Sequence, residues 1–358
     1  MTKRDYSLLG PDGRRAVETG LAAAEWYHTE VPRKVIKDLM QRTDQPAIRD
    51  TVILYGLMIL CAGLGIALWP SWWSALFWLV YGVLYGSASD SRWHECGHGT
   101  AFRTPWMNNV VFEIASFMIL RNSSTWRWSH ARHHTDTYIV GRDPEIAIMR
   151  PPVLAKVILS FVGIPQAIGF FPRMLYNAFI GVHPEEKTFV PESEWPRLIR
   201  VARISTAIYA ATILLAMWSW SLLPLMVIGL PSLYGAWHYI MAGLLQHGGL
   251  ADNVIDHRLN SRTVYMNPIS RFIYLNMNYH VEHHMFPMVP YHALPRLHEA
   301  IRHDLPAPSP SIPAAFAEMW PALKRQLANE DHFVRRDLPA TAKPYREDFH
   351  AAALGAAE

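Results

Sequence analysis

The stretch WHECGHGT, residues 93–100, decides how the rest of the chain must be arranged. It places His94 and His98 four residues apart, so that in a helix both imidazoles lie on one face. The HExxH spacing is typical of zinc metalloproteases, in which two histidines bind zinc and the intervening glutamate, here Glu95, activates water. Whether that interpretation applies depends on the other histidines, of which the chain has 18 in total.

Two later stretches share a second histidine pattern. HARHH at residues 130–134 and HVEHH at residues 280–284 both follow HxxHH. This spacing puts three imidazoles on one side of a helix, where they can converge on a cation. Roughly 0.04 such patterns are expected by chance in a chain of this length and histidine content, so two copies indicate a function. His247, in QHGGL, is a further candidate because it follows an apolar run as His94 does.

Nine histidines are therefore candidate metal ligands: His94, His98, His130, His133, His134, His247, His280, His283 and His284. A catalytic zinc with three protein ligands and one water needs far fewer. The protease interpretation leaves most of the patterned histidines without a role, and no second ExxH supports a ferritin-like carboxylate site. Nine nitrogen ligands suit two metals with open positions. Iron that meets oxygen fits this description, although copper and zinc also accept imidazole.

Composition indicates a membrane protein. The chain of 358 residues is 51% hydrophobic and only 18% charged, which is rich in apolar residues for a soluble protein. The net charge of +3 is small and the basic residues are scattered, which argues against a nucleic-acid partner. The two cysteines, Cys61 and Cys96, provide no disulfide framework and suit a reducing compartment.

Four apolar runs are candidate membrane spans. The first has nineteen uncharged residues, about 28 Å as a helix, which matches a hydrocarbon core. Short uncharged turns join the runs in pairs, so we expect two hairpins. The four runs are residues 51–69, 72–88, 204–218 and 225–245.

Two other apolar stretches, 106–120 and 153–171, are interpreted as interfacial or re-entrant. The first is too short to cross, and Pro165 interrupts the second. A single crossing there would also put the histidines before and after it on opposite sides of the membrane. The positive-inside rule places the basic N-terminal segment and the arginine-bearing central loop in the cytoplasm.

The sequence thus predicts an all-α integral membrane protein with four transmembrane helices in two hairpins and a cytosolic helical cap that carries the histidines. Residues 1–50 form a cytosolic N-terminal segment, and residues 51–304 form the membrane domain. Residues 305–358 form a cytosolic linker, helix and tail. Both termini and the site are expected on the cytoplasmic side.

The motifs HECGH, HARHH and NYHVEHHMFP, in this order and with QHGGL before the last, make residues from about 50 to 300 resemble the membrane fatty acid desaturase and hydroxylase superfamily. The resemblance implies that the nine histidines bind two non-haem irons, which activate molecular oxygen to attack an unactivated C–H bond. It favours desaturation of a fatty acyl or lipid chain, in a bacterial inner membrane. A hydroxylase or monooxygenase of a hydrocarbon or small molecule is the alternative, and a metal-binding membrane protein is a third.

Acidic residues are expected to support the metal ligands. Ligating imidazoles usually donate their second N–H to a carboxylate or carbonyl. We expect Glu95, Asp143 and Glu282 to serve the reaction in this way. Three further candidates are Asp136, Glu145 and Asp252.

Electrons must come from outside this part of the chain. Both desaturation and hydroxylation consume two external electrons per oxygen. The sequence contains no GxGxxG fingerprint, no CxxC iron–sulfur spacing and no haem-domain motif. We therefore expect a separate donor, a ferredoxin with its reductase, and membrane lipid as the other partner.

Overall fold

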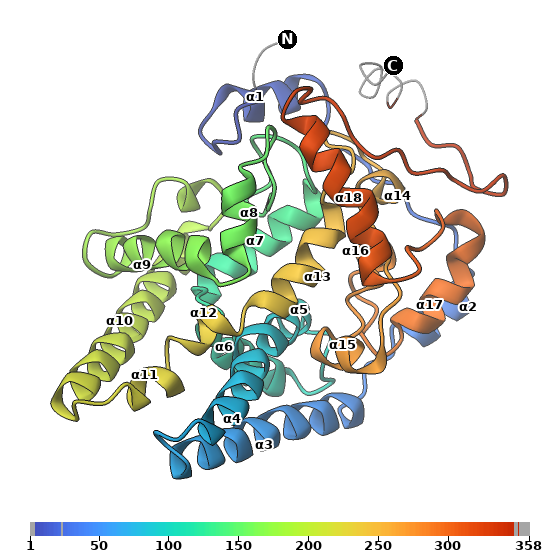
Figure 1. Cartoon of the computed structure of the whole chain (residues 1–358). Coiled ribbons are helices and arrows are strands. Elements are labelled where there is room, and N and C mark those ends of the chain that lie inside the picture. Colours follow the sequence, from blue (N-terminus) through green and yellow to red (C-terminus); the bar gives the residue numbers. More distant parts are fainter. Residues whose placement is uncertain (1–3, 23, 347–349, 351–358) are drawn as a thin grey trace.

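The computed structural model describes residues 4–22, 24–346 and 350, and every named element among these residues is a helix. The only β pairings among them are two isolated bridges. The all-α prediction is confirmed. Figure 1 shows two long helical arms that extend away from a cap.

The first arm is a helical hairpin. Helix α3 (Gln45–Ala67) packs against α4 (Trp73–Gly82), which continues through the π-helical segment η1 (Val83–Ala88) into α5 (Ser89–His98). Gly65 permits the close approach, because a Cβ at this position would lie 2.7 Å from the Trp78 ring. The hairpin thereby carries the chain from the end of α3 back to the first pair of histidines, at the end of α5.

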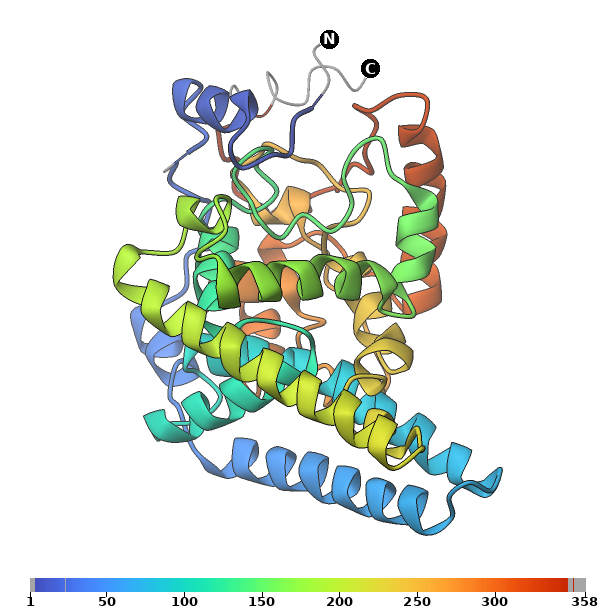
Figure 2. The ribbon, with the colours of Figure 1, turned by 90° about the vertical axis from the view of Figure 1, so that its left-hand side faces the viewer.

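The second arm is formed by α10 (Trp195–Trp218) and the segment after it. That segment is not one straight helix, since it is divided into α11 (Leu223–Val227), α12 (Pro231–Tyr234) and α13 (Trp237–His247). Gly229, with φ of 102°, and a proline at the start of α12 interrupt the helix. Figure 2 shows α10 lying across the front of the molecule, with α9 above it.

Three helical segments are long and apolar enough to cross a membrane: Gln45–Ala67, Glu192–Trp218 and Leu223–His247. They overlap three of the four expected spans. The fourth expected span, 72–88, is helical but is divided between α4 and η1 and does not meet this measure of length and composition. A further candidate is the pair α8 (Leu154–Ser160) and α9 (Ile164–Phe179), which meet at 85° and form either a broken span or a re-entrant loop. The structure therefore supports three or four apolar spans.

Tryptophans gather at the turns of both arms. Trp72 and Trp220 are 94% and 97% exposed, and large apolar side chains along α3 and α10 are also exposed. An apolar surface that ends in tryptophans is typical of a protein that lies in a bilayer with its turns at the headgroup level.

The cap carries the remaining histidines. Helices α7 (Ser123–Thr135) and α16 (His280–Met285) lie in its centre, and the side-chain oxygen of Asn122 accepts hydrogen bonds from the first backbone N–H groups of α7. Helix α18 (Ile312–Gln326) packs its apolar face on α13. The other elements are α1 (Pro11–Glu18), α2 (Arg33–Leu39), α6 (Pro105–Met118), η2 (Glu186–Thr188), η3 (Glu192–Glu194), α14 (His257–Asn260), α15 (Pro268–Ile273), α17 (Leu294–Ile301) and η4 (Arg302–Asp304).

A buried ion network ties the N-terminal segment to the cap. The guanidinium of Arg258 lies 2.8 Å from carboxylate oxygens of both Asp256 and Asp304. Asp304 also accepts hydrogen bonds from the hydroxyls of Tyr27 and Thr29, at 2.5 and 2.6 Å. The N-terminal segment is thereby fixed beside the helices that carry the histidines.

Candidate metal centre

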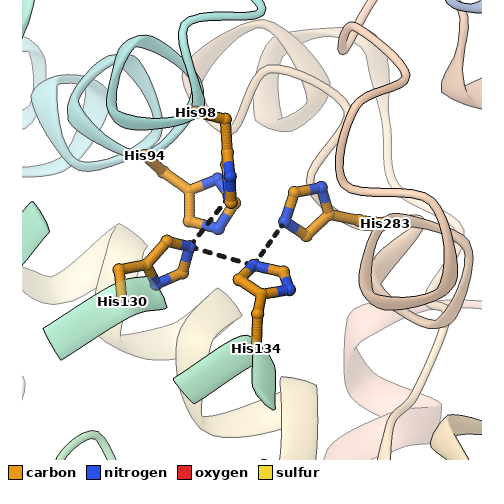
Figure 3. A group of neighbouring side chains, drawn as sticks. All are labelled: His94, His98, His130, His134 and His283. Atoms are coloured by element: carbon orange, nitrogen blue, oxygen red, sulfur yellow. Dashed lines mark hydrogen bonds between the residues drawn. The ribbon is translucent and has the colours of Figure 1, made fainter. Parts of the chain in front are cut away.

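The nine patterned histidines form two adjoining groups in the cap. Within each group, the potential ligand atoms all lie within 4.8 Å of one another. Figure 3 shows the first group, in which the rings of the five histidines face a common centre. The five-histidine group is His94, His98, His130, His134 and His283, and the four-histidine group is His133, His247, His280 and His284.

Helical geometry explains how α7 and α16 serve both groups. Residues four apart in a helix point in nearly the same direction, whereas consecutive residues differ by about 100°. On α7, His130 and His134 therefore point to the five-histidine group and His133 points to the other. On α16 the assignment is reversed. His280 and His284 belong to the four-histidine group, and His283 belongs to the five-histidine group.

The nitrogen separations fit metal coordination. In the five-histidine group, Nε2 of His130 lies 3.0 Å from Nε2 of His98 and 3.1 Å from that of His134. In the four-histidine group, Nε2 of His280 lies 3.0 Å from the Nε2 atoms of both His247 and His284. Two nitrogens bound about 2.1 Å from one metal at a right angle would lie about 3.0 Å apart. The side chains are thus arranged as ligands of a shared ion would be.

Burial keeps most of these imidazoles in the neutral form that metals bind. Burial lowers the pKa of His98 to about 4. Burial, followed by repulsion from neighbouring histidines, holds the pKa values of His94 and His130 well below the ordinary range. Both ring nitrogens of His94 are buried without a hydrogen-bond partner in the described chain, which is costly unless a metal binds one of them.

Two carboxylates from the loop after α7 orient ligand rings. Asp143 Oδ2 lies 2.8 Å from Nδ1 of His133, and Glu145 Oε2 lies 3.0 Å from Nδ1 of His130. Burial opposes protonation of His133, but the charge of Asp143 outweighs it and raises the pKa of this imidazole. Each carboxylate holds Nδ1 and leaves Nε2 for the metal, as in the outer hydrogen bonds of known metal sites. Burial raises the pKa of Glu145 to about 7.

The other two residues expected to serve the reaction have different surroundings. The Glu95 carboxylate accepts hydrogen bonds from the Thr100 hydroxyl and the Tyr291 backbone N–H, both at 3.1 Å. Glu282 is hydrogen bonded to the Thr263 hydroxyl and to His298. Neither carboxylate is hydrogen bonded to a histidine of the two groups, because both side chains point away from the groups toward these partners.

The remaining acidic candidates form ion pairs with arginines. Asp136 lies 2.9 Å from Arg142, and Asp252 lies 3.0 Å from Arg4. These contacts explain why the two aspartates do not reach the ligand rings.

The sequence patterns did not identify two neighbours of the four-histidine group. The backbone carbonyl of Asn260 accepts a hydrogen bond from Nδ1 of His247 at 2.8 Å. The ring of His257 stacks on Trp26 at 4.3 Å and lies 4.8 Å from the ring of His284. A backbone carbonyl leaves no trace in a sequence, and His257 stands outside every histidine pattern.

A family model of fatty acid desaturases matches residues 69–314, which is more than half of the chain and contains every histidine of both groups.

Plant desaturases are similar over most of the chain. A chloroplastic omega-3 fatty acid desaturase of Ricinus communis is 25% identical over 283 residues, which cover 71% of this chain and 58% of that protein. A temperature-sensitive sn-2 acyl-lipid omega-3 desaturase (ferredoxin) of Arabidopsis thaliana is 25% identical over 317 residues, covering 80% of this chain and 69% of the plant protein. An acyl-lipid omega-3 desaturase (cytochrome b5) of the same plant is 26% identical over 297 residues, covering 75% and 72%. The chain thus spans between 58% and 72% of the length of these relatives.

Proposed function

We propose that this chain, which belongs to the fatty acid desaturase family, desaturates a fatty acyl or lipid chain with molecular oxygen at a centre of two irons. The observation that carries the proposal is the gathering of nine histidines from four helices into two adjoining groups. In the overall reaction, two adjacent carbons each lose one hydrogen and gain a double bond. One oxygen molecule takes up those two hydrogens, two electrons from a donor and two protons from solvent, and forms two waters.

The five-histidine group would hold one iron and the four-histidine group the other. Bound iron would supply the oxygen activation that an unactivated C–H bond requires. The residues of the chain bind and orient: Asp143 fixes the ring of His133, and Glu145 fixes the ring of His130. Because imidazole ligands are neutral, they leave the charge of the metals uncompensated, which favours a strongly electrophilic centre.

The proposed electron donor is a separate protein. Two similar plant proteins carry different donors in their names, ferredoxin in one and cytochrome b5 in the other. For this chain we propose a ferredoxin with its reductase. The proposed location of the site is the cytoplasmic face of a bacterial inner membrane, since the positive-inside rule favours that side for the basic N-terminal segment and the central loop.

The first experiment is metal analysis of the purified chain, with about two irons per polypeptide expected. His130→Ala should remove iron from the five-histidine group and His280→Ala from the four-histidine group. His303→Ala is the matched control, because His303 is exposed and belongs to neither group. Retention of two irons by both cluster variants would overturn the assignment of ligands.

The second experiment is turnover with oxygen, ferredoxin, ferredoxin reductase and acyl lipids, followed by mass spectrometry. Desaturation gives a product with two hydrogens fewer, whereas hydroxylation gives a product with one oxygen more. Oxygen-containing products alone would support the monooxygenase alternative and contradict desaturation.

A further inference from the structure

An ion pair lies beside the five-histidine group, and neither of its side chains is hydrogen bonded to a histidine of that group. Arg121, in the loop between α6 and α7, places a terminal nitrogen 3.0 Å from Oδ1 of Asp90. Asp90 lies one helical turn before His94 on α5. The two side chains remain 17% and 16% exposed although residues on either side of them are buried, so both keep some accessible surface.

Two tryptophan rings fix the guanidinium. The central carbon of Arg121 lies 4.0 Å from the ring of Trp93 and 4.2 Å from the ring of Trp126. The negative faces of the two rings attract the guanidinium and hold it in place. The Trp93 ring in turn lies 5.3 Å from the ring of His130. Arg121 is therefore held one aromatic ring away from a proposed metal ligand.

The ion pair has unused hydrogen-bonding capacity. Apart from the contact between them, neither Arg121 nor Asp90 has a side-chain hydrogen-bond partner within the described residues, and the two atoms that meet are both buried. The buried Arg258 differs, since all three of its nitrogens are hydrogen bonded. The other guanidinium nitrogens of Arg121 and the second carboxylate oxygen of Asp90 are not fully buried, so they remain open to a further partner.

A tyrosine from α13 lies near the start of α5. Tyr239 is half-buried, and no described residue is hydrogen bonded to its hydroxyl. The backbone N–H of Tyr239 donates to Ser87, three residues before Asp90, which fixes α13 beside the start of α5. Tyr274 accepts a hydrogen bond from Gln246, the residue before His247.

We propose that Asp90, Arg121 and Tyr239 form a subsite for a neutral hydrogen-bonding group, such as a hydroxyl, carried by the acyl chain several bonds from the carbon that is oxidised. This inference rests on the proposed function and narrows its substrate class. The carboxylate and guanidinium already compensate each other, so a further charge would be buried without a partner, whereas a hydroxyl can donate to Asp90 and accept from Arg121. A plain hydrocarbon chain would leave these polar groups desolvated and unpaired.

The distance to the metals fits this role. Asp90 precedes His94 by four residues, a rise of about 6 Å, and Tyr239 precedes His247 by eight residues, about 12 Å along α13. Along both helices, the subsite therefore lies within the length of an acyl chain from the histidine groups.

Binding to the full-length protein as isolated, in lipid nanodiscs without oxygen or an electron donor, tests the subsite without any turnover. The probes are octadecanoic acid and the series of monohydroxyoctadecanoic acids, which share one headgroup and one chain length. We expect at least one hydroxy isomer to bind about tenfold more tightly than the plain acid, as one or two good hydrogen bonds would produce. Equal binding of the plain acid and every isomer would overturn the proposal.

The variants Asp90→Asn and Tyr239→Phe should each reduce that preference about five- to tenfold. Their matched controls are Asp38→Asn, in an exposed ion pair with Arg296, and Tyr234→Phe, in the same segment as Tyr239, and both should keep it. An unchanged preference in both subsite variants would show that water alone occupies the site and would overturn the proposal. Because neither oxygen nor an electron donor is present, a failure of the proposed desaturation would leave this result unaffected.

Discussion

Replacement of Asp143 by asparagine tests how the loop after α7 supports the metals. The Asp143 carboxylate lies 2.8 Å from Nδ1 of His133, and it also accepts the backbone N–H groups of Tyr138 and Glu145, both at 2.8 Å. An asparagine has one carbonyl oxygen in place of two carboxylate oxygens, so its amide nitrogen must face at least one of these donors. The variant therefore loses the charge beside His133 and creates a repulsive contact.

The expected magnitude follows from the single ligand that is affected. Removal of an outer hydrogen-bond partner typically weakens metal binding about 10- to 100-fold, which corresponds to about 1.4 to 2.8 kcal/mol. His133 belongs to the four-histidine group, so the loss should concern one of the two irons. Titration of the metal-free protein with ferrous iron against a chelator should show one site close to the wild-type affinity and one site weakened by that factor.

The matched control for Asp143→Asn is Asp136→Asn. Asp136 lies on the same stretch of chain but pairs with Arg142 and Arg132, not with a ligand histidine. It should bind both irons with affinities close to those of the wild type. Equal affinities in wild type and Asp143→Asn, or equal weakening of both sites, would refute the reasoning.

Three further predictions concern stability. Burial lowers the pKa of His98 to about 4, whereas a histidine in the unfolded chain titrates near pH 6.5, so the unfolded state binds more protons between these values. The metal-free protein should therefore lose thermal stability as the pH falls through this window, and a melting temperature that rises on acidification would contradict this. Arg258→Gln breaks two buried ion pairs and should destabilise the protein by about 3 to 5 kcal/mol, measured by denaturation in detergent. The control Arg302→Gln breaks an exposed ion pair and should cost less than about 1 kcal/mol. Gly65→Ala should cost about 1 to 3 kcal/mol through overlap with a tryptophan ring, whereas Gly63→Ala, which meets open space, should not destabilise the hairpin.

The histidine groups could be anticipated because their spacing is a local property. An HxxHH pattern fixes the relative directions of its imidazoles as soon as it forms a helix, so α7 and α16 present their rings as the sequence predicts. The pairing of particular histidines from different helices depends on tertiary packing. The sequence therefore indicated nine candidates and two metals, but not which rings share a centre.

The acidic partners were harder to anticipate for the same reason. Asp143 and Glu145 lie in an irregular loop that folds back on α7, whereas Glu95 and Glu282 lie within histidine patterns yet point away from the groups. Proximity in sequence to a ligand does not determine whether a side chain points toward that ligand. For Asp143 and Glu145, the fold of the loop after α7 determines this direction.

The candidate membrane spans could also be predicted only in part. The length and composition of residues 51–69 sufficed to place α3, because a long apolar run has few other solutions. The run 225–245 contains the same kind of residues but is divided at Gly229 and Pro231. Glycine and proline mark where such breaks are permitted, and packing against η1 and α4 decides where they occur.

The division of α7 between the two histidine groups constrains how this chain can evolve. One extra residue inserted between His130 and His133 would rotate the later rings by about 100° relative to the first. Both centres would lose a ligand in a single step, since this helix serves both. A substitution within these helices leaves the directions of the rings unchanged, whereas a change of length preserves them only in the loops that join the helices.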